Sequence, residues 1–337
     1  MKAYKKYSLL PYNTFGIDVT ANLFVEYDTV DELTAYLKQD MDATRPLLHI
    51  GGGSNLLFTH DYEGVIMHSA IGGIALVEQK DGKVQLKVGA GVVWDDFVAY
   101  TVAHGWYGAE NLSLIPGEVG ASAVQNIGAY GVEAKDIISY VDAVEIATGA
   151  TRRFMVDECQ YAYRSSIFKH ELKGKYIITH VCFTLSEAPE YHLDYGNIRA
   201  VLDQQNQPLS LQLLRDTIIG IRRAKLPEPE ELGNAGSFFM NPIVSREVFH
   251  RLIAAYPNVP HYIVGEEAVK IPAGWLIDQC GWKGKSLGPA AVYQKQALVL
   301  VNKGGATGDD VVKLAQAIMR SVEERFGVKL QPEVMMI

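Results

Sequence analysis

Residues 111–131 carry glycines, amides and hydroxyls in a pattern typical of main chain shaped around a ligand. Glycine adopts positive φ readily and lets bulky groups approach the backbone, so we do not expect this stretch to be a core element. Glu118 is its only charged residue, and successive amides can form a concavity that binds anions. We therefore predict a main-chain cradle for a diphosphate, while a glycine-rich connection between strands stays open as the alternative. The residues concerned are Gly117, Gly120, Ser122, Gln125, Asn126, Gly128 and Gly131.

A second glycine-rich segment, Gly-Gly-Gly-Ser-Asn at residues 51–55, directly follows a buried apolar run at residues 47–50. The dinucleotide fingerprint G-x-G-x-x-G requires glycine where this chain has Leu56, and no G-x-x-x-x-G-K-[ST] pattern follows. The segment is therefore neither a Rossmann turn nor a P-loop. A cofactor loop of another kind and a structural turn are both open interpretations.

Three separate polar residues lie in settings that suit chemistry. Arg164 stands among aromatic residues, where it either packs its stem at the surface or directs a cation into a site. Ser237 lies in a second run of small residues without a G-x-S-x-G elbow, so a turn serine is its plain interpretation. Glu333 lies in an apolar tail, where a satisfied or exposed carboxylate is the alternative to a catalytic acid.

The elements that must position these residues follow from periodicity and from cap and turn signals. An Asp-Gly pair between alternating apolar runs predicts a hairpin at residues 74–88, and Thr-Gly-Ala predicts another at residues 140–154. The final helix starts at a capping-box-like Thr307 and Asp310 and stops at Gly327. The first half is α+β with a mixed sheet and no regular β-α-β alternation. Further helices are predicted after residue 29, near residues 95–105, in the later part of 201–226, and at 271–281.

Composition limits the classes of function. The chain has 337 residues, 48% of them hydrophobic, which allows two or three globular domains. A net charge of −8 argues against a nucleic-acid surface, and an anionic ligand would need a few local cations. The three cysteines are too far apart for a disulfide framework or a zinc site. We expect no membrane insertion and a cytoplasmic location, because no signal-peptide core or membrane-length apolar run occurs.

Six motifs in order along the chain resemble those of the UDP-N-acetylenolpyruvoylglucosamine reductases. The resemblance spans nearly the whole chain, and the ordered set is far more specific than any single motif. Tyr195-Gly196-Asn197 further resembles the type of this family that has a substrate-covering tyrosine loop. The motifs are Asn-Thr-Phe-Gly at 13–16, residues 51–55, residues 115–131, Tyr-Arg-Ser-Ser-Ile-Phe at 163–168, Gly-Ser-Phe-Phe at 236–239, and Pro-Glu-Val at 332–334.

The resemblance implies an α+β fold with a two-subdomain FAD-binding part of the p-cresol methylhydroxylase type and a C-terminal α+β substrate-binding domain. We place FAD-binding subdomain 1 at residues 1–72 and subdomain 2 at residues 73–226, with the tyrosine loop near residues 191–200. The substrate-binding domain then covers residues 227–326, and residues 327–337 form a tail that returns to the active site.

By resemblance, FAD is bound without a covalent link, NADPH is the co-substrate and a UDP-sugar is the substrate. We expect the protein to be monomeric or weakly associating. Gly52 departs from relatives that often carry an acid at this position. The residues that match the family's cofactor contacts are Gly51, Gly52, Gly53, Ser54, Asn55, Ile115, Pro116, Gly117, Gly120, Ser122, Asn126, Gly128, Gly131 and Arg164.

The resemblance also assigns roles in catalysis. Ser237 matches the proton donor, Arg164 the cation beside the substrate carboxylate, and Glu333 the acid that works with Arg164. Residues 263–267 depart from the family pattern, which bears on the neighbouring Tyr262 and Lys270. The residues that match UDP-sugar contacts are Tyr195, Lys225, Asn241, Tyr262, Lys270 and Gln296.

Two rival functions stay open at this stage. The first is a flavin oxidase of the same cofactor fold with a covalent flavin link, for which neither His49 nor His104 is a convincing attachment point. The second is a nucleotide-sugar-binding protein that has kept the fold and lost catalysis, and the joint presence of Ser237, Arg164 and Glu333 argues against it.

Overall fold

The computed structural model describes residues 1–41 and 44–337, which form two compact units. The first unit holds most of the N-terminal two thirds. The second unit combines the C-terminal third with two short segments from the N-terminal part of the chain. The first unit is Met1–Ser8, Thr20–Gly52 and Tyr62–Ala224, and the second is Leu9–Val19, Gly53–Asp61 and Lys225–Ile337.

The first unit begins with a four-stranded mixed sheet in the order β1-β2-β5-β3. Strands β2 and β3 run parallel to the central β5, whereas β1 is antiparallel to β2. Helix α1 (Val30–Ala35) starts as predicted, because the Thr29 hydroxyl accepts the amide N–H of Glu32 at 3.1 Å. The strands are β1 (Lys2–Ser8), β2 (Thr20–Tyr27), β3 (Leu47–Ile50) and β5 (Tyr62–Ser69).

A five-stranded antiparallel sheet in the order β11-β10-β12-β7-β6 forms the rest of the first unit's β-structure. Both predicted hairpins are confirmed as β6–β7 and β10–β11. The first turns at Asp81 and Gly82, which have φ of +53° and +72°. The strands are β6 (Ile74–Lys80), β7 (Lys83–Gly89), β10 (Ile138–Glu145), β11 (Thr151–Met155) and β12 (Tyr176–Ser186).

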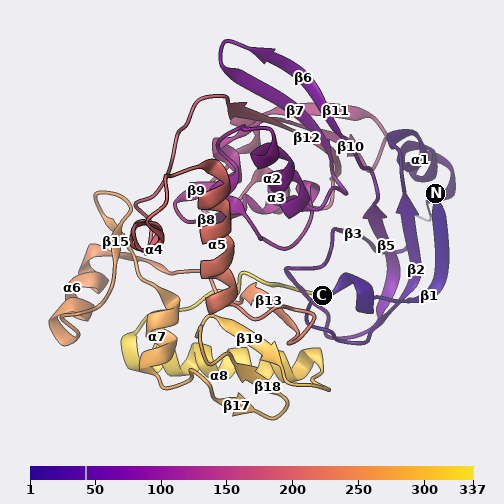
Figure 1. The fold of residues 1–337 in the computed structure, drawn as a ribbon. Coiled ribbons are helices and arrows are strands. Elements are labelled where there is room, and N and C mark those ends of the chain that lie inside the picture. Colours follow the sequence, from indigo (N-terminus) through magenta and orange to yellow (C-terminus); the bar gives the residue numbers. More distant parts are fainter. Residues whose placement is uncertain (42–43) are drawn as a thin grey trace. The chain divides into compact units, whose positions relative to one another are not determined.

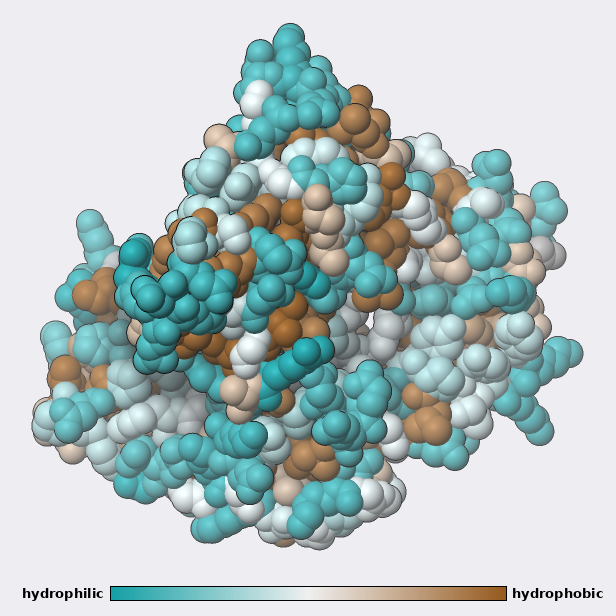
Figure 2. Space-filling model, viewed as in Figure 1, coloured by the Kyte–Doolittle hydropathy of each residue, from teal (hydrophilic) through white to brown (hydrophobic). Residues whose placement is uncertain are grey.

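Helices α2 (Trp94–Ala103) and α3 (Val119–Gln125) cover one face of this sheet (Figure 1). The ring centroids of Phe97 and Phe183 are 4.5 Å apart, and those of Trp94 and Phe183 are 5.7 Å apart. Each such fully buried aromatic side chain contributes about 1.5–3 kcal/mol. Figure 2 shows hydrophobic side chains among polar ones on the visible face around these helices.

Helix α3 corrects one prediction from the sequence. We expected no core element within residues 111–131, yet Val119 and Ala123 are fully buried against the sheet. Glycine is usually unfavourable in a helix, but here it permits contact: a Cβ on Gly120 would lie 2.8 Å from the Cβ of Ala90. The glycine-rich composition therefore reflects close packing as well as turns.

Two further helices complete the first unit, α4 (Ile198–Gln205) and α5 (Leu211–Lys225). Lys225, the last residue of α5, already belongs to the second unit. Arg215 on α5 makes a bidentate ion pair with Asp95 on α2, with both N–O distances 2.8 Å. Asp95 also accepts the amide of Leu114 at 2.6 Å, so this pair fixes the chain where it enters the glycine-rich stretch.

The second unit contains a four-stranded sheet in the order β13-β19-β18-β17 and a three-stranded sheet in the order β14-β16-β15. Helix α8 (Gly308–Phe326) confirms the predicted final helix, with a capping box at Thr307 and Asp310 and a stop at Gly327, φ +65°. Helix α7 (Ala273–Gln279) also lies where it was predicted. The other elements are α6 (Arg246–Ala255), β13 (Asn234–Ser237), β14 (Ile243–Ser245), β15 (Tyr262–Ile263), β16 (Ala268–Lys270), β17 (Ser286–Leu287), β18 (Ala290–Val292) and β19 (Val299–Asn302).

Two further pairs of short strands complete the structure, one in each unit. Strand β20 (Met335–Met336) pairs in parallel with β4 (Leu56–Leu57), and β8 (Gly128–Ala129) pairs with β9 (Val132–Glu133). Within residues 1–41 and 44–337, no helix is both long and apolar enough to cross a membrane. The same described residues contain no group of three or more His, Cys, Asp or Glu that could hold a metal ion.

Candidate active site

The two glycine-rich segments predicted separately from the sequence meet inside the first unit. The turn after β3 passes close to the start of α3, so that a Cβ on Gly52 would lie 3.9 Å from the Cα of Gly117. A Cβ on Gly51 would lie 3.1 Å from Oε2 of Glu118. Side chains at these two positions would fill the space between the segments, which explains the glycines and fits a cofactor held against main chain.

Main-chain hydrogen bonds fix the start of α3 on the loop that precedes α2. The amide of Trp94 donates to the carbonyl of Gly117 at 2.9 Å, and the amide of Gly120 donates to Ala90 at 2.9 Å. Ser122, one of the predicted cofactor residues, is buried and donates its hydroxyl to the carbonyl of Val119 at 2.6 Å. The hydroxyl of Ser122 thus stabilises its own helix in this structure.

Asn126 ends α3 in the left-handed conformation, with φ +47°. It is fully buried, and its side chain donates to the carbonyl of Ala162 at 2.9 Å while accepting the amide of Lys135 at 3.0 Å. One amide side chain therefore ties three segments of backbone together. Asparagine suits this position because it tolerates positive φ and offers both a donor and an acceptor.

Arg164 lies against the chain that follows Asn126. Its guanidinium donates to the carbonyl of Gly128 and, at 3.4 Å, to that of Asn126. A Cβ on Gly128 would lie 2.8 Å from Nη1 of Arg164, so only glycine admits the cation here. Arg164 is half-buried with φ +53°, and its carbonyl accepts Nζ of Lys169 at 2.9 Å. The charged guanidinium of Arg164, and not only its aliphatic stem, therefore contacts the glycine-rich stretch.

Tyr195, the residue of the predicted tyrosine loop, is 42% exposed and meets the same stretch from another side. Its ring lies perpendicular to that of Tyr130, with centroids 6.3 Å apart. A Cβ on Gly131 would lie 3.5 Å from that of Tyr195. Asn111 donates to the carbonyls of both Tyr130 and His192, at 3.0 and 2.8 Å, and so holds the two segments together.

Ser237 and Glu333 come close together in the second unit. Ser237 is the last residue of β13, and the next residue, Phe238, accepts the amide of Glu333 at 2.8 Å. Asn55 donates its side-chain amide to the carbonyl of Glu333 at 3.2 Å, and its own carbonyl accepts the amide of Met335 at 3.0 Å. Both Ser237 and Glu333 are half-buried. A serine and a carboxylate thus share one hydrogen-bonded strand edge.

Gly53 fixes the turn that presents Asn55. It has φ +69°, and a Cβ there would lie 1.8 Å from the carbonyl oxygen of Tyr12. The amide of Thr14 donates back to the carbonyl of Gly53 at 3.4 Å. The motif at residues 13–16 is therefore the support of the 53–55 turn, a role that the sequence did not reveal.

The predicted UDP-sugar residues of the second unit fall into two groups. The side-chain oxygen of Asn241 accepts the backbone amide of Ala273 at 2.9 Å, and that of Gln296 accepts the backbone amide of Leu298 at 3.3 Å. Lys270 and Tyr262 are partners on neighbouring strands β16 and β15, with Nζ 5.7 Å from the ring centroid. Lys225, at the end of α5, is exposed.

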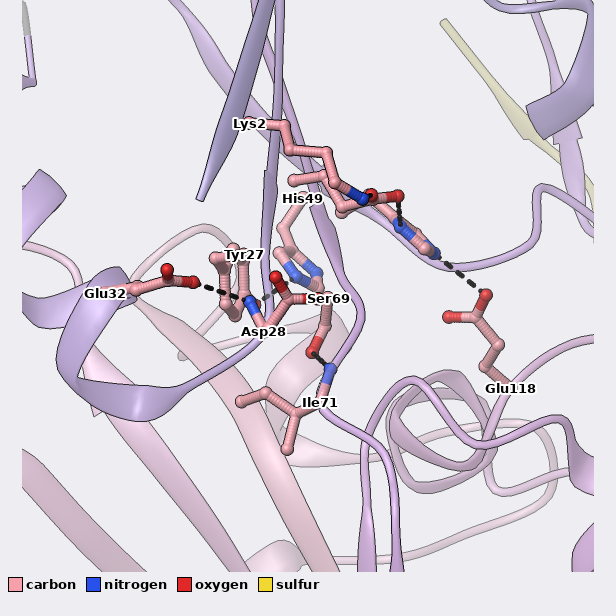
Figure 3. Close-up of polar contacts among 10 residues, drawn as sticks. Lys2, Tyr27, Asp28, Glu32, His49, Ser69, Ile71 and Glu118 are labelled. Atoms are coloured by element: carbon pink, nitrogen blue, oxygen red, sulfur yellow. Dashed lines mark hydrogen bonds and ion pairs between the residues drawn. The ribbon is translucent and has the colours of Figure 1, made fainter.

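A chain of charged side chains that the sequence did not reveal reaches the glycine-rich turn. His68, on strand β5, contacts Oε1 of Glu118 at 2.9 Å through Nε2 and Oε2 of Glu26 at 3.3 Å through Nδ1. Lys2 and Glu118 lie at the two ends of this chain of contacts (Figure 3). Lys2 pairs with the other oxygen of Glu26 at 2.9 Å. Burial lowers the pKa of His68, but the hydrogen bonds with Glu118 and Glu26 outweigh it, so the pKa is raised. A histidine among the buried residues 64–69 of this strand was the available signal.

The predicted site residues are therefore divided between the units. Arg164, Tyr195 and the 115–131 stretch lie in the first unit with Gly51 and Gly52. Ser237, Glu333 and the 53–55 turn lie in the second unit with the remaining UDP-sugar candidates.

Comparisons with known proteins match two separate parts of the chain. A model of the FAD-binding domain matches residues 21–154, and the model described as "UDP-N-acetylenolpyruvoylglucosamine reductase, C-terminal domain" matches residues 228–337. Among solved structures, the chain is similar to the UDP-N-acetylenolpyruvylglucosamine reductase of Thermus caldophilus, with a TM-score of 0.67, 23% identity and coverage of 99% and 98% of the two chains. It also resembles p-cresol methylhydroxylase, with a TM-score of 0.50, 12% identity and coverage of 94% and 82%. These likenesses confirm the predicted fold class.

Sequence relatives extend the match to the whole chain. The UDP-N-acetylenolpyruvoylglucosamine reductase of Bacteroides fragilis (strain YCH46) is 58% identical over 330 residues, covering 98% of each chain. That of Porphyromonas gingivalis (strain ATCC 33277) is 47% identical, covering 97% of each. At this identity over essentially its full length, the chain belongs to the UDP-N-acetylenolpyruvoylglucosamine reductase family.

Proposed function

We propose that this chain reduces the enolpyruvyl ether of UDP-N-acetylglucosamine to UDP-N-acetylmuramate, using FAD and NADPH, through the residues named below. It is thus a FAD-dependent UDP-N-acetylmuramate dehydrogenase of peptidoglycan precursor synthesis. The observation that carries this proposal is the family relationship over 98% of the chain. Ser237, Arg164 and Glu333 are assigned because they lie in sequence motifs that resemble those of the family.

FAD is assigned to the main chain of residues 51–55 and 115–131. The support is that Gly51 and Gly52 approach Gly117 and Glu118 with space that side chains would fill, and that the FAD-domain match includes both segments. Amide-rich turns of this kind hold a diphosphate without lysine, which suits a chain of net charge −8. These residues would hold FAD, which would supply the chemistry for hydride transfer from NADPH to the terminal carbon of the enolpyruvyl group.

Arg164 is assigned to the negative charge that develops beside the substrate carboxylate. A fixed guanidinium stabilises such charge best when it is already oriented, because no reorganisation is then needed during the reaction. Its hydrogen bonds to the carbonyls of Asn126 and Gly128 supply that orientation. Nζ of Lys169 also donates a hydrogen bond to the main-chain carbonyl of Arg164.

Ser237 is assigned as the proton donor to the carbon adjacent to the hydride acceptor. A serine hydroxyl is a weak acid, so it can act only on a strongly basic, carbanion-like carbon and with support for the alkoxide. Glu333 is assigned to the enol or carboxylate together with Arg164. The strand edge that carries both Ser237 and Glu333 supports a joint role, since backbone hydrogen bonds hold these residues in register.

The UDP-sugar is assigned to Tyr195, Lys225, Asn241, Tyr262, Lys270 and Gln296. Lys225 and Lys270 supply cations for the diphosphate. The partly exposed ring of Tyr195, edge-on to Tyr130, supports assignment to the family type with a substrate-covering tyrosine loop. We further propose a cytoplasmic enzyme that is monomeric or weakly associating, with subdomains at residues 1–72 and 73–226, a substrate domain at 227–326 and a returning tail at 327–337.

The two half-reactions test this proposal. We expect purified full-length protein to be yellow, to release its flavin on denaturation, and to be bleached by NADPH under anaerobic conditions. Addition of the UDP-sugar substrate should then restore the yellow colour. A colourless preparation that does not take up FAD would contradict the proposal.

The same experiment separates the rival functions. A flavin oxidase would retain its flavin after denaturation and would be reoxidised by oxygen after reduction by substrate. Against covalent attachment at His49, its Nε2 is hydrogen-bonded to Tyr27 at 2.7 Å, and burial lowers its pKa to about 3. A binding protein without catalysis would take up the UDP-sugar yet leave the reduced flavin unchanged.

A further inference from the structure

The carboxylate of Glu118 is a half-buried charge directed at the predicted cofactor turn, and the reaction described above gives it no role. Its side chain is 13% exposed and points away from α3 toward β5 (Figure 3). Oε1 is 2.9 Å from Nε2 of His68, and Oε2 faces the position where a Gly51 side chain would begin, at 3.1 Å. One oxygen is thus anchored and the other faces the turn.

A chain of alternating charges holds this carboxylate in place. It runs from Lys2 on β1 through Glu26 on β2 and His68 on β5 to Glu118, with successive contacts of 2.9, 3.3 and 2.9 Å. Both ring nitrogens of a histidine can donate hydrogen bonds to carboxylates only when the imidazole is protonated. The raised pKa of His68 favours the protonated state. With His68 protonated, the four charges sum to zero.

The arrangement selects a particular kind of ligand group. A carboxylate only accepts hydrogen bonds, and it repels phosphate, so a neighbouring ligand must present a donor. FAD carries hydroxyl donors on its ribityl chain and on its adenosine ribose. Glycine at residues 51 and 52 lets the turn lie directly against the Glu118 carboxylate, since a Cβ at either position would lie within 3.1–3.7 Å of its oxygens.

We propose that Glu118 binds FAD by accepting a hydrogen bond from a ribityl or ribose hydroxyl, and that His68 is the positioning residue for its carboxylate. This inference rests on the proposed placement of FAD at residues 51–55 and 115–131. It adds a cofactor contact supplied by a side chain to a cradle otherwise made of main chain.

The test measures FAD affinity of the full-length protein by flavin fluorescence after exchange of the bound cofactor. We expect Glu118→Gln to weaken FAD binding roughly 10-fold and Glu118→Ala somewhat more, because a charge-assisted hydrogen bond is lost. The matched control is Glu63→Gln, which removes an exposed carboxylate from the same strand as His68 and should leave FAD affinity unchanged. Thermal unfolding of each flavin-free variant checks the fold.

Riboflavin and ADP identify the hydroxyl. Riboflavin carries only the ribityl chain, whereas ADP carries only the ribose. The ligand whose affinity falls in Glu118→Gln holds the donor. Unchanged or tighter binding of FAD by both Glu118 variants would overturn the inference while leaving the proposed function intact. Failure of the unaltered protein to bind FAD would instead overturn the proposed function.

The role of His68 has a separate readout. The charged groups facing it are Glu26 and Glu118, with His49 nearby and Lys2 behind Glu26. If His68 acts through Glu118, FAD affinity should fall in the unaltered protein as pH rises through the pKa of His68, and should be flat in Glu118→Ala. A His68→Gln change should have little further effect on Glu118→Ala. Additive losses in the double variant would show that His68 has only a structural role.

Discussion

The glycine-rich stretch of the first unit and the Ser237–Glu333 edge of the second unit are built in opposite ways. In the first, the polar side chains of Ser122 and Asn126 are buried and bonded to backbone. In the second, backbone hydrogen bonds hold the chain, and the side chains of Ser237 and Glu333 are left half-buried. The side chains of the glycine-rich stretch therefore determine the shape of its main chain, whereas the Ser237–Glu333 edge presents side chains suited to chemistry.

This contrast predicts different consequences of substitution. Changes in the glycine-rich stretch should reduce stability and cofactor retention together, because its side chains hold its backbone. Changes at the strand edge should reduce rate with little effect on stability, because backbone hydrogen bonds hold the chain there.

The largest effect is expected for Ser237→Ala. Loss of a positioned proton donor should slow substrate reduction about 10²–10⁴-fold, while reduction of the flavin by NADPH stays nearly unchanged. Stopped-flow absorbance of the flavin measures the two half-reactions separately, and thermal unfolding should match that of the unaltered protein. Equal loss of both half-reactions would remove the case for Ser237 as proton donor.

Asn126→Ala should act in the opposite manner, through stability. It removes the hydrogen bonds of the Asn126 side chain with the carbonyl of Ala162 and the amide of Lys135 and places alanine at positive φ, at a cost of about 3 kcal/mol. The control is Asn206→Ala, an exposed residue with φ +50°, which should lose only about 1 kcal/mol. Urea denaturation measures both, and equal losses would show that the backbone angle alone matters.

Asp95→Asn should loosen the entry to the glycine-rich stretch. Burial raises the pKa of Asp95, but hydrogen bonds from Arg215 and Leu114 lower it more, so the net shift is downward. Its stabilising effect is therefore present above the ordinary carboxyl pKa and is lost as pH falls through the lowered value. We expect a loss of about 2 kcal/mol at pH 7, since the pair is partly exposed, and a smaller difference in acid. A difference that grew on acidification would contradict this sign.

The smallest effect is expected for His68→Gln measured against pH. Because the pKa of His68 is raised in the fold, its charged contacts with Glu26 and Glu118 stabilise fully below the ordinary histidine pKa and fade as pH rises through the raised value. The variant should lose about 1 kcal/mol at pH 6 and less at pH 9. Denaturant midpoints at the two pH values decide the outcome, and a constant difference would show that charge is not involved.

Local signals predicted several of the elements correctly. Helix α8 was read from its capping box, apolar face and glycine stop, and the β6–β7 hairpin from its Asp-Gly turn. These signals are short-range, so they are complete within a few residues. Helix α3 was missed because glycine and serine argue locally against a core helix, whereas close contact with Ala90 favours small residues there.

The sequence by itself determined the family, the fold class and the list of residues suited to flavin and UDP-sugar chemistry, because ordered motifs and residue types are properties of the chain. Only the tertiary structure decided that Gly51 and Gly52 meet Glu118, that His68 anchors its carboxylate, and that Glu333 is hydrogen-bonded beside Ser237. These contacts join residues from 50 to nearly 100 positions apart in the chain. Such pairings depend on how strands stack and register, which no local pattern records.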